Sequence, residues 1–115
     1  MRMTEALNLE LDTVVVVETA AQPWSGSRAE GVVRKPLERE QAEAGRATSI
    51  VQFEPGARFP PHTHALGEEI LVLSGEFIDD HGRYPAGTWM RSPHLSQHNP
   101  WVEQETLIYV KTGHL

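Results

Sequence analysis

The amino-acid sequence predicts a single all-β domain, built as a sandwich or a barrel. Short runs of β-branched and aromatic residues recur along the second half of the chain, and such runs are typical of strands. Glycine and proline stand between the runs and mark turns. No segment has a convincing helical pattern. At 115 residues, the chain is long enough for one domain with one hydrophobic core.

The first part of the sequence is expected to be loosely organised. Residues 1–19 are expected to form an N-terminal strand or arm, with the four valines at 14–17 as the strand. Residues 20–115 are expected to form the main domain. Within it, residues 20–30 form an irregular arm held by Trp24, and residues 38–45 form a polar connection rather than a helical turn.

From Arg46 onward the pattern alternates between strands and turns. The turns are predicted where glycine, proline or aspartate tolerate the required backbone angles. Gly56 and Gly75 are expected at positive φ, where only glycine is comfortable. The expected strands cover residues 48–53, 69–73, 76–78, 88–91 and 106–110.

Composition narrows the partners and the chemistry. The formal net charge is −6 and no segment concentrates basic residues, so nucleic acid is not an expected partner. The sequence has no cysteine, so a metal ion would be held by imidazole and carboxylate groups, and the composition fits a cytoplasmic protein. No apolar run resembles a signal peptide or a membrane span, so no membrane association is expected.

The segment between Gly56 and Gly75 carries the residues most indicative of function. Residues i and i+2 of a strand lie on one face, so His62 and His64 are expected to point together into the barrel. After a tight bend, Glu68 begins the next strand. Two imidazoles and one carboxylate at one point are typical of non-haem metal sites. The spacing therefore predicts that His62, His64 and Glu68 bind one divalent metal ion.

A fourth ligand is expected from a later part of the chain. His81 lies in a predicted turn and is expected to face solvent, while His114 lies near the end of the sequence and is expected to fray. His94 and His98 both follow Pro93. On spacing alone, these two histidines remain alternatives.

These residues resemble the two sequence motifs of the cupin superfamily. All positions of the first motif are matched, by Gly56, His62, His64, Glu68 and Gly75. The second is matched by Gly87, Pro93 and His98, with Leu95 where glycine is usual and Val102 where asparagine is usual. The resemblance implies the cupin double-stranded β-helix, a jelly-roll barrel. It also implies that His98 is the fourth ligand and that His94 lies at the barrel mouth.

A more specific similarity is to the cupin domain of ChrR-type anti-sigma factors and its stand-alone relatives. It covers residues 20–111, and it is carried by residues 45–51, 53–60, 67–73 and 84–88. In ChrR-type proteins a separate N-terminal zinc-binding domain binds the sigma factor. The similarity covers the cupin domain and not that zinc-binding domain. It therefore implies the fold and the metal site but not the anti-sigma role. Iron, zinc, manganese or nickel would suit such a ligand set.

Two functions are compatible with this ligand set. The first is a metal-dependent dioxygenase that acts on a small carbonyl or dicarbonyl substrate, and the second is a non-catalytic sensor or ligand-binding cupin. The residues expected to line the pocket are Phe59, Trp89, Met90, Arg91 and Tyr109. Gln97 is a further candidate, as a hydrogen-bond partner of the metal ligands, whereas strand alternation should turn Glu69 away. A homodimer is expected, with the valine run and the Trp24 arm in its interface.

Overall fold

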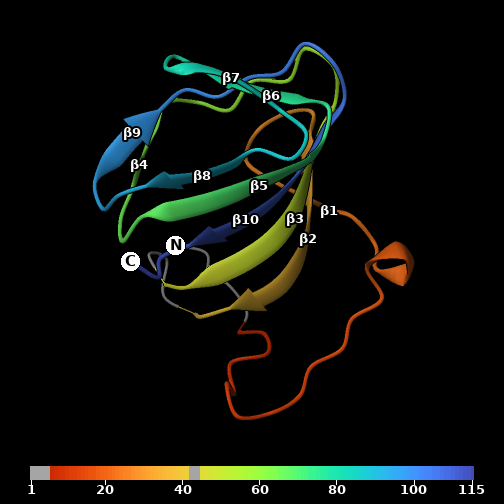
Figure 1. Ribbon diagram of the computed structural model, residues 1–115. Coiled ribbons are helices and arrows are strands. Elements are labelled where there is room, and N and C mark those ends of the chain that lie inside the picture. The colour runs from red at the N-terminus through yellow and green to blue at the C-terminus, as the bar shows by residue number, and fades with distance from the viewer. Residues whose placement is uncertain (1–5, 42–44) are drawn as a thin grey trace.

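The main wall of the barrel is a six-stranded antiparallel sheet, seen in Figure 1 of the computed structural model. The structure describes residues 6–41 and 45–115. The strands lie in the order β1-β2-β3-β10-β5-β8. Their bounds are Ser25–Gly26 for β1, Val32–Arg39 for β2, Ala47–Phe53 for β3, Thr106–Thr112 for β10, Glu68–Ser74 for β5 and Trp89–Ser92 for β8.

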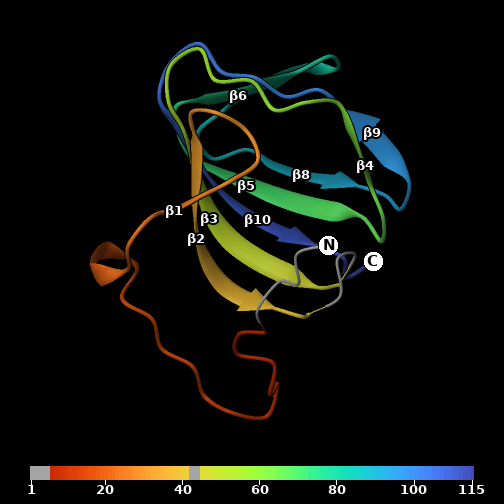
Figure 2. The same cartoon turned by 180° about the vertical axis from the view of Figure 1, so that it is seen from behind.

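Two short antiparallel pairs cover the open side of this sheet (Figures 1 and 2). One pair joins β4 (His62–His64) to β9 (Ser96–His98), and the other joins β6 (Glu76–Asp79) to β7 (Gly82–Pro85). Trp101 links the covering layer by isolated bridges to Arg58 and Ile78. The chain thus folds as a single all-β barrel, which confirms the predicted fold class.

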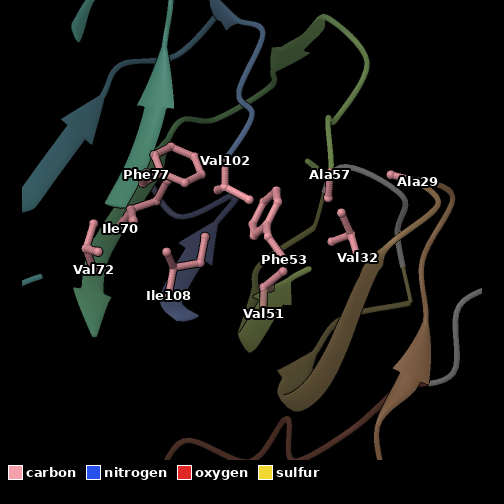
Figure 3. Close-up of a cluster of buried hydrophobic side chains, with 10 residues drawn as sticks. All are labelled: Ala29, Val32, Val51, Phe53, Ala57, Ile70, Val72, Phe77, Val102 and Ile108. Carbon is pink, nitrogen blue, oxygen red and sulfur yellow. The ribbon is translucent and has the colours of Figure 1, made fainter. Parts of the chain in front are cut away.

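The hydrophobic core lies between the large sheet and its cover. In β3 and β10 every second side chain faces inward, so Val51, Phe53 and Ile108 are buried. Phe77 comes from the cover, and its ring meets the edge of the Phe53 ring at a centroid distance of 5.7 Å. Figure 3 shows these side chains converging with Val102 between them. Burial of this apolar set is the main force that closes the barrel.

The strands predicted from Arg46 onward correspond to β3, β5, β6, β8 and β10, whereas β1, β2, β7 and β9 were not predicted. Strand β2 contains Lys35, Pro36, Glu38 and Arg39, residues that weaken a strand pattern. A register shift between Pro36 and Glu38 accommodates the proline. The predicted polar connection is therefore shorter than expected, because Glu38 and Arg39 belong to β2; its residues 42–44 lie outside the described part of the chain.

The N-terminal arm differs from the prediction in one respect. The valine run at 14–17 is extended, but it pairs with no strand within the described residues. The predicted role of Trp24 does appear, since Lys35 lies 4.5 Å from the centre of its ring. Lys35 also donates a hydrogen bond to the Thr19 carbonyl of η1 (Thr19–Ala21). Residues 1–5 of the predicted arm lie outside the described part. No helix among the described residues is long and apolar enough to cross a membrane.

We expect Gly75→Ala to destabilise the fold far more than Gly56→Ala. Both glycines have positive φ, 79° and 82°, as predicted. A Cβ on Gly75 would lie 2.3 Å from the Glu105 carbonyl oxygen, whereas a Cβ on Gly56 would meet nothing within 4 Å. The left-handed conformation costs about 1–2 kcal/mol in either variant, and the overlap adds about 1–3 kcal/mol in Gly75→Ala.

Urea unfolding followed by tryptophan fluorescence measures this difference. Equal losses of unfolding free energy in the two variants would show that the close approach of Gly75 to residues 105–106 does not constrain the fold.

Candidate metal centre

Four side chains meet at one end of the barrel interior. The antiparallel pairing of β4 with β9 sets His62 opposite His98, and alternation along β4 turns His64 to the same side. Glu68 is the first residue of β5. One ligand atom from each of the four side chains lies within 4.8 Å of the other three. His64, Glu68 and His98 are buried, and His62 is half-buried.

The separations suit a shared metal ion. The Nε2 atoms of His62 and His64 are 2.7 Å apart. Oε1 of Glu68 lies 3.4 Å from Nε2 of His64 and 3.5 Å from Nε2 of His98. Adjacent ligand atoms around an ion with metal–ligand bonds of about 2.1 Å are roughly 3 Å apart. The cluster is therefore close to the size that a bound ion requires.

Contacts on the outer side of the rings orient the histidines for ligation. Nδ1 of His62 lies 2.8 Å from the carbonyl oxygen of Pro60, which can only accept a hydrogen bond. Nδ1 of His98 lies 3.5 Å from Oδ2 of Asp79, and Nδ1 of His64 lies 3.4 Å from Oγ of Ser96. With the proton on Nδ1, the Nε2 lone pair points into the cluster, as metal ligation needs.

Without a metal ion, the environment disfavours the charged forms of these side chains. Burial, with the nearby His98 and His62, lowers the pKa of His64 to about 3. Burial, with the nearby Asp79, raises the pKa of Glu68 to about 8. Oε1 of Glu68 is also buried without a hydrogen-bond partner. A divalent cation would satisfy this oxygen and the Nε2 lone pairs together, so the donor set fits the expected metal ion.

Hydrogen bonds hold the bend between β4 and β5 (residues 65–67, the fastened bend) from two sides. His94 accepts a hydrogen bond at Nδ1 from the backbone N–H of Leu66, at 2.7 Å. From the other side, the backbone N–H groups of Gly113 and Leu115 donate to the carbonyls of Gly67 and Leu66. His94 thus lies beside the cluster without joining it, and its contact with the bend was not predicted.

Asp79 is the main functional candidate that the sequence analysis missed. It is buried, and its Oδ1 accepts hydrogen bonds from the backbone N–H groups of His81 and Gly82 and from the Tyr84 hydroxyl. Its other oxygen, Oδ2, is left facing His98. The Asp-Asp-His-Gly sequence was recognisable only as a turn signal. Its register at the end of β6, which directs Asp79 inward, needed the fold.

Three other polar predictions have mixed outcomes. Gln97 is exposed, and its neighbour Ser96 faces His64 instead, because alternation along β9 turns Gln97 outward. Glu69 does turn away from the site, where it pairs with Arg91 and with His114. That contact and the backbone bonds of the last residues hold His114 in place, so the expected fraying was wrong. The His81 side chain is exposed, as expected.

A cavity of about 160 Å³ opens beside the cluster. Of the five predicted pocket-lining residues, only Phe59 lines it. Its lining comprises Arg34, Arg39, Ala47, Ser49, Val51, Phe53, Phe59, His62, Glu68, Ile70, Phe77, His98, Pro100, Ile108, Val110 and Thr112.

Strand alternation explains the other four predicted residues. Trp89 is 54% exposed on the outer face of β8, where Arg91 lies over its ring at 5.0 Å. Met90 faces inward but packs against the core away from the cavity. On β10, Ile108 and Val110 line the cavity, which turns Tyr109 to the opposite face.

The jelly-roll barrel with three histidines and a glutamate at one end defines a cupin. The model of the ChrR Cupin-like domain family matches residues 12–115. The chain therefore belongs to this family, as its motifs implied.

Solved structures share the fold at low sequence identity. ChrR of Rhodobacter sphaeroides, solved in complex with SigE, aligns with a TM-score of 0.68 and 23% identity over 83% of this chain. The chain spans 50% of the length of that ChrR protein. A putative acetylacetone dioxygenase from Methylibium petroleiphilum aligns with a TM-score of 0.77 and 17% identity, covering 87% of this chain and 76% of its own.

The fold also matches the polyketide cyclase RemF from Streptomyces resistomycificus, with a TM-score of 0.72 and 18% identity, over 88% of this chain and 80% of RemF. No functionally curated protein gives a significant sequence match. Identities this low establish the shared fold and leave the activity of this chain to the chemistry of its own site.

We expect Asp79→Asn to weaken metal binding by about 10–100-fold while His98→Ala abolishes it. An asparagine can still accept at Oδ1, but its amide would place a donor against Nδ1–H of His98 and disfavour the ligating tautomer. Competition with a chelating dye measures the zinc dissociation constant. Asp80→Asn, at the exposed neighbouring position, serves as the control. An unchanged dissociation constant in Asp79→Asn would exclude an orienting role for Asp79.

Proposed function

We propose that this chain is a mononuclear metal cupin that binds a small carbonyl or dicarbonyl compound and oxidises it as a dioxygenase. His62, His64, Glu68 and His98 would hold the metal, for which iron, zinc, manganese and nickel are the candidates. The observation that carries the proposal is the placement of this four-residue cluster beside a cavity, which His62, Glu68 and His98 help to line. In the cell we place the protein in the cytoplasm.

The residues around the cavity suit a small organic substrate. Phe59, Phe77 and Ile108 contribute apolar surface to the space beside the cluster. Pro60, Ser96 and Asp79 hold the imidazoles so that the donor atoms are arranged before a ligand arrives. When bound, iron(II) would supply the redox and Lewis-acid chemistry that these side chains lack.

A cavity of about 160 Å³ limits the substrate to a molecule of roughly the size of benzene, which fits an apolar cavity of about 150 Å³ in another protein. Small diketones are of this size. Cleavage by a dioxygenase breaks one carbon–carbon bond of the diketone and places both atoms of dioxygen in the two products. It therefore needs no further oxidant or reductant. The structural likeness to the putative acetylacetone dioxygenase supports this choice of substrate class.

Anaerobic iron loading followed by oxygen-electrode assays on a panel of small diketones and keto acids tests the proposal. We expect about one iron per chain and oxygen uptake that depends on at least one member of the panel. Both should be lost in His62→Ala and His98→Ala, because each removes one ligand. His81→Ala removes an exposed histidine outside the cluster and should change neither.

Two outcomes would contradict different parts of the proposal. Bound iron with no oxygen uptake across the panel would remove the dioxygenase activity. No metal in the native protein, even after reloading, would remove the metal centre itself.

The second candidate function is a metal-binding sensor that performs no turnover. Membership of the ChrR Cupin-like domain family favours it, since the ChrR protein was solved in complex with a sigma factor. A protein partner is possible on the same ground. A stable complex with a sigma factor in a pull-down, together with inactivity toward diketones, would support this function over the dioxygenase.

We also propose a homodimer built on the N-terminal arm. Val14 and Val16 are 89% and 86% exposed, and the valine run has no strand partner within the described residues. Strand addition to a second copy would bury these side chains. Light scattering should give twice the 12.9 kDa mass of one chain, and Val14→Asp with Val16→Asp should give a monomer. Leu95→Asp, at an exposed apolar site outside the arm, should remain dimeric. A native mass near 12.9 kDa would contradict the dimer.

A further inference from the structure

Two arginines of β2 face the same cavity as the metal cluster. Inward-facing Val51 lies opposite Arg34 in the β2–β3 register, and Ala47 lies opposite Arg39. All four residues line the cavity. Strand β2 lies near one end of the large sheet, as Figures 1 and 2 show. Its two arginines therefore bring positive charge to a different side of the cavity from the four residues of the cluster.

These guanidinium groups lack the partners that arginines inside proteins normally have. Across residues 6–41 and 45–115, no carboxylate forms an ion pair with Arg34 or Arg39. The Nε atom of Arg34 is buried without a hydrogen-bond partner. By contrast, the exposed Arg83 pairs with both Glu76 and Glu103. A half-buried guanidinium with a buried Nε atom and no ion-pair partner among the described residues is costly to the fold, so its retention needs another explanation.

Positive charge gathers on the β2 side of the cavity. Burial lowers the pKa of the Arg34 guanidinium, and the nearby charges of Arg39 and Arg28 lower it further. Arg28 lies over the ring of Phe59, at 5.4 Å, and its charge also lowers the pKa of His62. One glutamate ligand cannot neutralise a divalent cation. The loaded centre would therefore add to this positive charge, although the chain as a whole has a net charge of −6.

We propose that the cavity binds a small organic carboxylate, with the carboxylate group held by Arg34 and Arg39 and a carbonyl group directed at the metal cluster. This inference rests on the proposed function and specifies its substrate class as a keto acid rather than a neutral diketone. The planar guanidinium donors match a carboxylate in geometry as well as charge. Because the cavity has room for only one small molecule, a ligand that fills it touches both the arginines and the cluster.

Acetoacetate and acetylacetone are a matched pair for the test, because they differ only in a carboxylate oxygen in place of a methyl group. Titration calorimetry on the zinc-loaded protein, which avoids oxidation, measures both dissociation constants. We expect acetoacetate to bind at least tenfold more tightly. In Arg34→Met the preference should fall below threefold, and Arg34→Lys should retain part of it. Arg83→Met removes one paired surface charge and should leave the preference unchanged.

Inorganic phosphate is the competing probe that separates a carboxylate site from a general anion site. Displacement of acetoacetate by phosphate at equal concentration would overturn the assignment to carboxylates. Thermal unfolding of the ligand-free variants checks the fold. Arg34→Met should be at least as stable as the native chain, because it removes a half-buried charge that has no ion-pair partner among the described residues. If it is less stable, Arg39→Met provides the same comparison of ligands.

The remaining outcomes separate this inference from the proposed function. Equal affinity for the two ligands in the native protein with zinc bound would overturn the carboxylate site and leave the metal centre intact. If zinc does not bind, the metal centre fails. In that case, acetoacetate binding to the metal-free native chain that is lost in Arg34→Met would still support the arginine site, and its absence would overturn it.

Discussion

The constraint on which the rest of the structure depends is the energetic cost of collecting three imidazoles and one carboxyl group in the barrel interior. Nε2 atoms 2.7 Å apart and a glutamate oxygen without a hydrogen-bond partner are unfavourable unless a cation lies between them. The surrounding structure keeps the donors together despite this cost. The β4–β9 pairing fixes His62 opposite His98, and the fastened bend sets the distance from His64 to Glu68. The fold therefore includes a local free-energy cost, which a bound metal ion would lower.

The sequence predicted the ligand cluster well because its information is local. His62, His64 and Glu68 lie within one strand, one bend and the start of the next strand, so alternation alone nearly determines their direction. His98 was harder, since β9 is short and polar, and on spacing alone it could not be separated from His94. Only the resemblance to the cupin motifs favoured it. The structure brings His98 into the cluster and sets His94 against the backbone of the bend.

The walls of the cavity were predicted poorly, since they depend on the register between distant strands. Aromatic residues near the ligands in sequence were expected to line the pocket, but Trp89 and Tyr109 fall on the outer faces of their strands. Arg34 and Arg39 belong to β2, which was not predicted because its proline and charged residues weaken the strand pattern. Their position opposite Val51 and Ala47 followed only from the pairing of β2 with β3. Asp79 was missed for a related reason, since its sequence indicated only a turn and its inward direction depends on the register of β6.

One departure from the cupin motifs has a conformational consequence, and a second leucine near the cluster shares it. Leu95 stands where glycine is usual, and its φ is +68°; Leu66, in the fastened bend, has a φ of +60°. Left-handed backbone at a leucine costs about 1–2 kcal/mol. The conformation of each leucine therefore lowers the free energy of unfolding, and both leucines lie in loops beside the cluster. Both side chains are exposed, which excludes core packing as the reason for their presence.

The attachment of the last residues to the bend has a practical consequence for handling the protein. The side chain of Leu115 lies against Gly67, close enough that a methyl group there would overlap it. Any polypeptide joined after Leu115, such as a purification tag or a fused reporter, therefore leaves the barrel directly beside the backbone that spaces His64 and Glu68. A reporter fused at that end would sense the geometry of the cluster.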